Sequence, residues 1–143
     1  MNYIKQAELR WSDLDPNFHL RHSVYYDLGA YCRISFLFDN GITEEVMRRH
    51  FIGPVLFREE CFFKREIKFG DAISISLTLK SVSADFRKFS MQHEIFKNEN
   101  EPAALLIIDG AWMDTVKRKI VAPPQIIIDT LNAIPKTEDY TIR

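Results

Sequence analysis

Residues 22–38 form a long stretch with few helix-breaking residues and with apolar side chains on almost every side. Seventeen residues at 1.5 Å each would make a helix about 25 Å long. A helix that is apolar nearly all round is usually covered by other parts of the protein. Gly29 lowers helix stability by roughly 1 kcal/mol relative to alanine, so we interpret it as a point of close packing. The stretch therefore predicts one long, buried helix that ends near Asn40 and Gly41.

Five other segments have the apolar patterns of β-strands. A strand points successive side chains to opposite faces, and residues 73–80 alternate strictly between Ile or Leu and a polar residue. Residues 103–113 are apolar almost without interruption, which is typical of a central strand covered on both faces. The expected strands are 3–11, 54–67, 73–80, 89–95 and 103–113.

Two short helices complete the expected elements, one after a Thr43 cap and ending at Arg49, and one over residues 125–133. Strands joined by short polar turns favour an antiparallel sheet, so we predict one α+β domain spanning residues 1–143. The sheet leaves an edge that invites pairing, and the apolar run 103–113 needs cover on its second face. We therefore expect a homodimer or a homotetramer.

Composition and charge exclude several classes of protein. The 143 residues carry a net charge of -1, which argues against electrostatic binding to nucleic acid. No apolar run approaches the roughly 20 residues of a membrane-spanning helix, and the first residues lack a signal-peptide pattern. We interpret Cys32 and Cys61 as reduced core residues, because their spacing fits no metal site. These features predict a cytoplasmic protein.

Residues 13–23 hold the densest group of reactive side chains, between the first strand and the long helix. Asp13 and Asp15 share a face if this segment is extended, and the proline that follows Asp15 disfavours a helical backbone there. His22 and Ser23 fall near the helix start, where free backbone N–H groups and the helix dipole favour negative charge. A carboxylate beside such a helix start has the minimum parts for hydrolysing an activated acyl group.

Simpler interpretations of these residues stay open. Asp-Pro-Asn is common in turns, and Asp15 or Ser23 can serve only to cap the helix. Two aspartates with two histidines could suggest a metal site, but no known ligand spacing follows downstream. We interpret His93 as a hydrogen-bonded core histidine and Asp109 as a structural residue near a kink at Gly110.

Residues 11–25, WSDLDPNFHLRHSVY, resemble the opening motif of the hotdog-fold acyl-CoA thioesterases of the 4-hydroxybenzoyl-CoA type. Weaker similarities at Arg33, over 86–90 and over 112–123 extend the resemblance to nearly the whole chain. It implies a hotdog fold, in which a five-stranded antiparallel sheet wraps around one long central helix. It also implies that Asp15 is the catalytic carboxylate.

The resemblance implies an enzyme that cleaves an acyl-CoA, or a related carrier thioester, into a free acid and a thiol. Asp15 would act as general base for water or as nucleophile, with His22 beside it, and the helix start would stabilise the oxyanion. No cofactor is implied, since coenzyme A is part of the substrate. The candidate substrate-binding residues are Phe18, Ser23, Tyr25, Tyr26, Arg87 and Lys88.

The chain departs from the family pattern at three positions. Phe18 stands where the family often has a glycine, and Ala30 and Ser35 stand where many relatives carry glutamate. The missing glutamates motivate an alternative, a non-catalytic module that binds acyl or CoA ligands. A third hypothesis is an acyl-thioester dehydratase, which needs an acid/base pair, and no second member stands out near Asp15.

Overall fold

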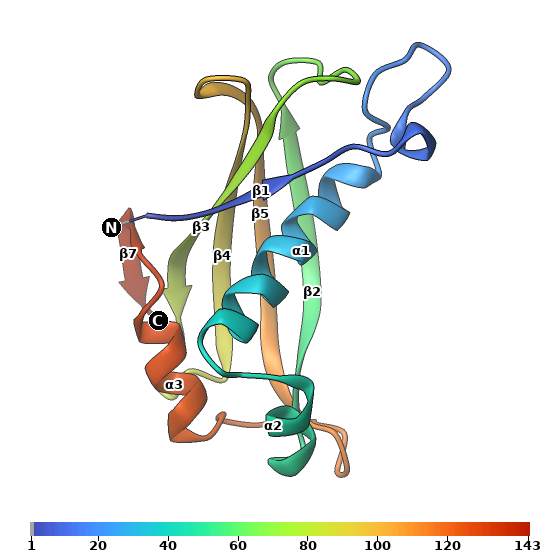
Figure 1. Ribbon diagram of the computed structural model, residues 1–143. Coiled ribbons are helices and arrows are strands. Elements are labelled where there is room, and N and C mark those ends of the chain that lie inside the picture. Colours follow the sequence, from blue (N-terminus) through green and yellow to red (C-terminus); the bar gives the residue numbers. More distant parts are fainter. Residues whose placement is uncertain (1) are drawn as a thin grey trace.

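The computed structural model describes residues 2–143, and its sheet contains one continuous antiparallel path in the order β1–β3–β4–β5–β2. Figure 1 shows this sheet curling behind the longest helix. The prediction of an antiparallel sheet built from these five segments is confirmed. The strands are β1 (Tyr3–Ala7), β2 (Ile52–Phe63), β3 (Ile73–Val82), β4 (Lys88–Lys97) and β5 (Glu101–Asp114). The first strand is shorter than predicted, because the chain turns into a short 3-10 helix at η1 (Trp11–Asp13).

Two further strands were not predicted. β6 (Lys119–Ile120) pairs with the end of β5, and β7 (Lys136–Ile142) pairs in parallel with β3. One edge of β3 is therefore shared, since β1 pairs with residues 73–77 and β7 with positions from 79 to 82. β7 is mostly polar and exposed, so it carries no apolar alternation by which a strand could be recognised.

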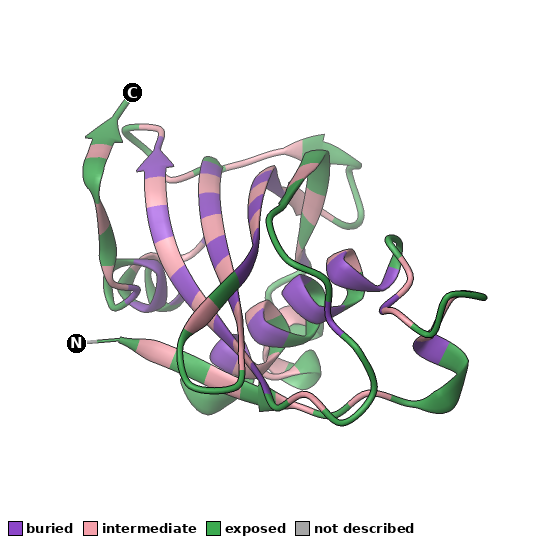
Figure 2. Cartoon of the chain, turned by 90° about the horizontal axis from the view of Figure 1, so that it is seen from above, coloured by how far each residue is buried: buried purple, intermediate pink, exposed green. Residues whose placement is uncertain are grey.

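The longest helix, α1 (Val24–Asp39), lies against one face of the sheet (Figures 1 and 2). Val24, Leu28 and Cys32 follow one another at four-residue intervals, so they share the buried side of the helix. Gly29 permits the close packing that the sequence predicted. A Cβ atom on it would lie 3.1 Å from Leu106 Cδ1 of β5.

The opposite side of α1 is not covered in the single chain. Tyr31, Ile34 and Phe38 are 44%, 41% and 48% exposed. The prediction of a helix covered all round is wrong for one chain, because the sheet of that chain reaches only one side of it.

The middle of β5 is likewise fully buried on one face only, although neighbouring residues at its two ends are buried on both faces. Leu106 and Ile108 are fully buried, whereas Leu105 and Ile107 between them are half-buried. Within residues 2–143 the second face of this part of β5 is only partly covered, so cover on both faces, for which the sequence analysis expects a second subunit, stays a prediction.

β2 contains a bulge where it pairs with the last part of β5. Leu56 pairs with Gly110 and Arg58 pairs with Asp109, so Phe57 has no partner of its own. Asp109 Oδ2 lies 3.8 Å from Arg58 Nη1, which agrees with a structural interpretation of this carboxylate.

The two shorter α-helices agree with the sequence. They are α2 (Glu44–Arg49) and α3 (Gln125–Asn132). The Thr43 Oγ1 atom accepts a hydrogen bond from the N–H of Val46 at 3.3 Å, as expected for a helix cap. Within residues 2–143, no helix is both long and apolar enough to cross a membrane.

Candidate active site

The loop between η1 and α1 is held by Asp15. Its Oδ1 atom accepts hydrogen bonds from the N–H of Asn17 at 2.8 Å and from the N–H of His19 at 3.2 Å. The Asp15 N–H in turn donates to the His19 carbonyl at 2.8 Å. Asp15 therefore holds a turn, as the sequence Asp-Pro-Asn suggested, but only its Oδ1 atom does so. Within residues 2–143, the Oδ2 atom of Asp15 has no hydrogen-bond or ion-pair partner.

Phe18 occupies a backbone conformation that normally belongs to glycine. Its φ angle is +64°, in the left-handed region, and its side chain is 61% exposed. A bulky residue is strained there by roughly 1–2 kcal/mol. The ring lies 6.1 Å from that of Trp11, between centroids. The loop thus keeps the shape of a glycine turn without the glycine.

This strain predicts the relative stability of two variants. We expect the free energy of unfolding of Phe18→Gly to exceed that of Phe18→Val by about 1–2 kcal/mol, because a β-branched residue tolerates the left-handed region worst. The glycine variant should therefore unfold at a higher urea concentration. Equilibrium urea unfolding of both variants at one protein concentration measures the difference. A more stable valine variant would show that the loop relaxes to another conformation.

Asp13 does not share the environment of Asp15. It is buried, and Arg10 holds it through a 2.8 Å contact from Nη2 to Oδ1 and a 2.8 Å hydrogen bond from the backbone N–H to Oδ2. The Arg10 hydrogen bond lowers the pKa of the Asp13 carboxyl. The expectation that both aspartates face one way is wrong, because η1 interrupts the extended backbone between them and the first strand. Asp13 therefore fixes the loop through Arg10, whereas Asp15 keeps one oxygen without a hydrogen bond in the described residues.

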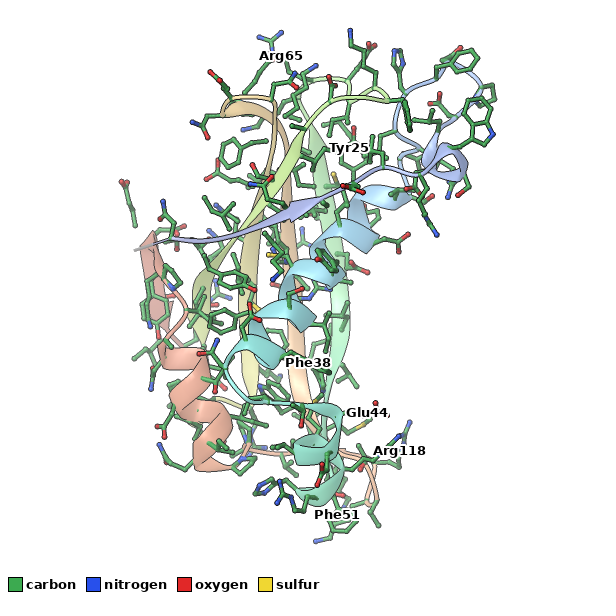
Figure 3. All side chains as sticks on the ribbon, viewed as in Figure 1. Tyr25, Phe38, Glu44, Phe51, Arg65 and Arg118 are labelled. Carbon is green, nitrogen blue, oxygen red and sulfur yellow. The ribbon has the colours of Figure 1, made fainter. Side chains whose placement is uncertain are left out.

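Asp15 lines a groove of about 310 Å³ between the loop, the start of α1 and the end of β2. Figure 3 shows two of its residues, Tyr25 and Arg65, at the same end of the molecule. Six lining residues are not among the catalytic or substrate-binding candidates from the sequence: His19 and Leu20 of the loop, and four residues of a distant segment, 63–66. The groove residues are Asp15, His19, Leu20, His22, Tyr25, Phe63, Lys64, Arg65 and Glu66.

Two side-chain pairs shape this groove. His19 Nε2 lies 3.2 Å from Glu66 Oε2, which ties the loop to the segment after β2. Tyr25 is buried and meets the ring of Phe63 edge-on, with centroids 4.9 Å apart. Burial raises the pKa of the Tyr25 hydroxyl to about 12, so this hydroxyl is neutral near pH 7. Tyr25 therefore contributes to the core and to the groove wall alike.

The start of α1 offers backbone donors beside the carboxylate. Neither the N–H of His22 nor that of Ser23 has an acceptor within the described part of the chain. The Ser23 side chain makes no cap bond; its Oγ atom instead accepts from Arg21 Nε at 3.0 Å. Ser23 thus occupies the N-cap position of α1, but its side chain does not cap the helix. His22 is exposed, and it lines the groove.

Five of the sequence candidates lie outside the groove lining of their own chain. Phe18 packs against Trp11, the Ser23 side chain turns to Arg21, and Tyr26 packs against the core. Arg87 and Lys88 are the remaining two, and they lie at the other end of the sheet. Lys88 pairs with Ala111, and Phe63 pairs with Ala104, seven residues away along β5. At 3.3 Å per residue the separation is roughly 23 Å.

The described residues contain no group of three or more His, Cys, Asp or Glu side chains that could hold a metal ion. The two cysteines are free, with Cys32 buried and Cys61 half-buried.

The sequence over residues 9–131 matches the model of the thioesterase-like superfamily. None of the curated proteins with which the chain was compared matches it.

Several solved structures share the fold. A hypothetical protein from Staphylococcus aureus in complex with CoA has 13% identity and a TM-score of 0.83, over 96% of this chain and 88% of that one. A 1,4-dihydroxy-2-naphthoyl-CoA thioesterase from Synechocystis has 16% identity and a TM-score of 0.83, over 93% and 97%. A thioesterase from Thermus thermophilus with coenzyme A and Zn has 22% identity and a TM-score of 0.76, over 91% of each chain. The curled antiparallel sheet therefore fits a hotdog fold.

Proposed function

The chain belongs to the thioesterase-like superfamily, and on this basis we propose that it hydrolyses an acyl-CoA, or a related carrier thioester, to a free acid and a thiol. The observation that carries the proposal is the free Oδ2 atom of Asp15, in a groove that also contains the start of α1. The CoA-bound relatives from Staphylococcus aureus and Thermus thermophilus support a CoA thioester as the ligand.

In the proposed reaction, Asp15 acts through the oxygen that the turn does not use. As a general base, it takes a proton from water while the water oxygen bonds to the thioester carbonyl carbon. As a nucleophile, it bonds to that carbon itself, and water later releases the acid. In both routes the carbon–sulfur bond breaks and sulfur leaves as thiolate. A thiol has a pKa near about 8.5, so no strong general acid is required.

The backbone donors of His22 and Ser23 would bind the carbonyl oxygen as its negative charge develops. They precede α1, whose dipole adds positive potential at that end. Removing one such donor from an oxyanion site typically costs about 2.7–4 kcal/mol of transition-state stabilisation. We assign the backbone of His22 this role and leave its ring to contact the substrate or to orient Asp15.

Thiol release from a panel of acyl-CoA thioesters tests the activity. We expect release well above the background rate for at least one aliphatic or aromatic acyl group, with the free acid identified by mass. Saturable binding of CoA esters without any thiol release would favour the non-catalytic module instead. A product whose mass differs from the substrate by one water, with the thioester intact, would favour the dehydratase.

We also propose that two copies pair through β2, with the site near the subunit boundary. β2 ends the strand order, so within residues 2–143 it has a partner on one side only. Its exposed apolar residues, with those on the open side of α1, suit a covered interface. Antiparallel pairing would also bring Arg87 and Lys88 of the second copy to the end that holds Asp15. The exposed residues are Leu56, Phe57, Phe62 and Phe63 on β2, and Tyr31, Ile34 and Phe38 on α1.

Light scattering during size-exclusion chromatography measures this assembly. We expect a mass of at least twice 16.8 kDa at micromolar concentration. Phe57→Lys places a charge on the free edge and should shift the mass toward 16.8 kDa. Val116→Lys, an equally apolar-to-charged change on the turn after β5, is the matched control and should leave the mass unchanged. A monomeric natural chain contradicts the proposal.

A further inference from the structure

A second cavity lies between the middle of α1 and the sheet, away from the Asp15 groove. Its volume is about 200 Å³, and most of its lining is apolar. A cavity of about 150 Å³ is large enough to hold benzene, so this one can take a single ring or a short alkyl chain. Among its lining residues are Ile34, Leu37, Leu77, Phe89, Met91 and Ile134.

One charged side chain, Arg33, also lines this cavity. Its Nη1 atom lies 3.0 Å from Nε2 of His93, whose Nδ1 atom lies 2.9 Å from the Ser76 carbonyl oxygen. Burial, with the nearby Arg33 charge, lowers the pKa of His93 to about 3, so the imidazole is neutral. Arg33 has only donors, so Nε2 accepts and Nδ1–H donates to the carbonyl. His93 is thus a hydrogen-bonded core histidine, as predicted, and it supplies no negative charge.

The Arg33 guanidinium has no counter-ion in contact. Within the described residues, no carboxylate forms an ion pair with it at 4.0 Å or less, and Glu59 acts on its pKa only as a more distant charge. One of its five N–H donors is used. A largely buried charge without a paired anion is costly, so the site favours an anion brought by a ligand.

A second donor in the cavity lining lacks an acceptor. Trp112 is 1% exposed, and its indole Nε1–H has no hydrogen-bond partner within residues 2–143. Buried polar atoms are nearly always hydrogen-bonded. Arg33 and Trp112 thus both belong to the lining of an otherwise apolar cavity, and both carry donors without an acceptor in the described residues. They lie at different points along the cavity, since Arg33 contacts His93 opposite Leu106 and Trp112 is six residues further along β5.

We propose that this cavity binds a small organic acid, with its carboxylate on Arg33 and its hydrocarbon part among the apolar residues, Trp112 included. A guanidinium complements the two oxygens of a carboxylate, and an uncharged group of the same size leaves the charge unpaired. The carboxylate has two possible sources. It belongs to a free acid, or it is the distal end of an acyl group whose other end is a thioester.

The indole N–H signals in a ¹H–¹⁵N NMR spectrum test the binding directly, because the chain has two tryptophans, Trp11 and Trp112. Addition of hexanoate should shift the Trp112 signal and leave that of exposed Trp11 unchanged. Hexanamide should bind about tenfold more weakly or not at all. Trp112→Phe assigns the signal and removes the donor.

Arg33→Gln should abolish the preference for hexanoate over hexanamide, whereas Arg58→Gln, on the exposed edge strand, should keep it. Arg33→Lys keeps the charge and should retain part of the preference for hexanoate. It provides the comparison if Arg33→Gln folds poorly. Equal shifts by the acid and the amide, or a preference that survives Arg33→Gln in a folded protein, would overturn the proposal.

Hydrolysis of adipoyl-CoA and hexanoyl-CoA distinguishes the two sources, and this arm rests on the proposed function. A higher kcat/KM for adipoyl-CoA that disappears in Arg33→Gln assigns the anion to the acyl group. Equal rates, with hexanoate still shifting Trp112, assign it to a free acid. If no thioester is cleaved, the proposed hydrolysis fails while the NMR result on the cavity stands independently.

Discussion

Replacing Asp15 with asparagine is expected to lower the kcat of thioester hydrolysis by roughly 10²–10⁴-fold, the range typical of a lost general base. The substitution suits the site because an asparagine Oδ1 atom can still accept the hydrogen bonds from Asn17 and His19 that hold the turn. Only the oxygen without a partner changes, from a basic carboxylate oxygen to an amide nitrogen. The loop should therefore keep its conformation, while the protein loses the basic oxygen that the proposed reaction requires.

The measurement compares kcat and KM of the two proteins on the best thioester of the panel. Asp114→Asn is the matched control, because Asp114 Oδ1 likewise accepts two backbone N–H groups, from Val116 and Lys117, at 2.9 and 2.8 Å. Asp114 is the last residue of β5, away from the Asp15 groove, and its variant should retain the natural rate. Equal turnover by Asp15→Asn would remove Asp15 from the mechanism while leaving the fold assignment untouched.

Gly110→Ala is expected to cost the most stability of the substitutions considered, about 3 kcal/mol of unfolding free energy. A Cβ atom on Gly110 would lie 2.4 Å from the Val55 carbonyl oxygen and 2.8 Å from Phe89 Cζ. The ring of Phe89 can rotate, but the carbonyl belongs to the backbone of β2 beside its bulge. Relief of the contact therefore requires β2 to move away from β5.

Urea unfolding at one fixed protein concentration measures this loss, since association would change the apparent stability. Gly53→Ala is the control, because its new Cβ atom would meet only Thr115 Cγ2, at 3.5 Å. That substitution should be neutral or stabilise by up to about 1 kcal/mol. Equal urea midpoints for the two variants would show that β2 moves away from β5 at its bulge with no loss of unfolding free energy.

Most of the elements could be predicted because their patterns are local. The apolar stretch 22–38 corresponds to α1 within two residues at each end, and the alternation over 73–80 corresponds to β3. β7 was missed because a polar edge strand carries no such pattern. The position of 103–113 within the sheet was predicted, but an apolar composition does not say whether the cover of the second face comes from the same chain.

The candidate site also contains one part that could be predicted from the sequence and one part that could not. Asp15 and the helix start are near neighbours in sequence, so their proximity followed from the loop alone. Lys64 and Arg65 enter the groove only because β2 ends beside the start of α1, which depends on the sheet order. The left-handed backbone at Phe18 could not be predicted either, because a phenylalanine does not indicate a positive φ angle. The family resemblance offered the one hint, a glycine at that position in relatives.

The shared edge of β3 has a consequence for how the chain can associate. β1 has five residues, and β7 is short and mostly polar, so neither offers a long apolar ladder to another molecule. The twelve-residue β2 is the extended free strand at the other limit of the sheet. If two copies pair through β2 as proposed, their remaining edges carry only the five-residue β1 and the mostly polar β7, so edge-to-edge pairing would stop at two copies.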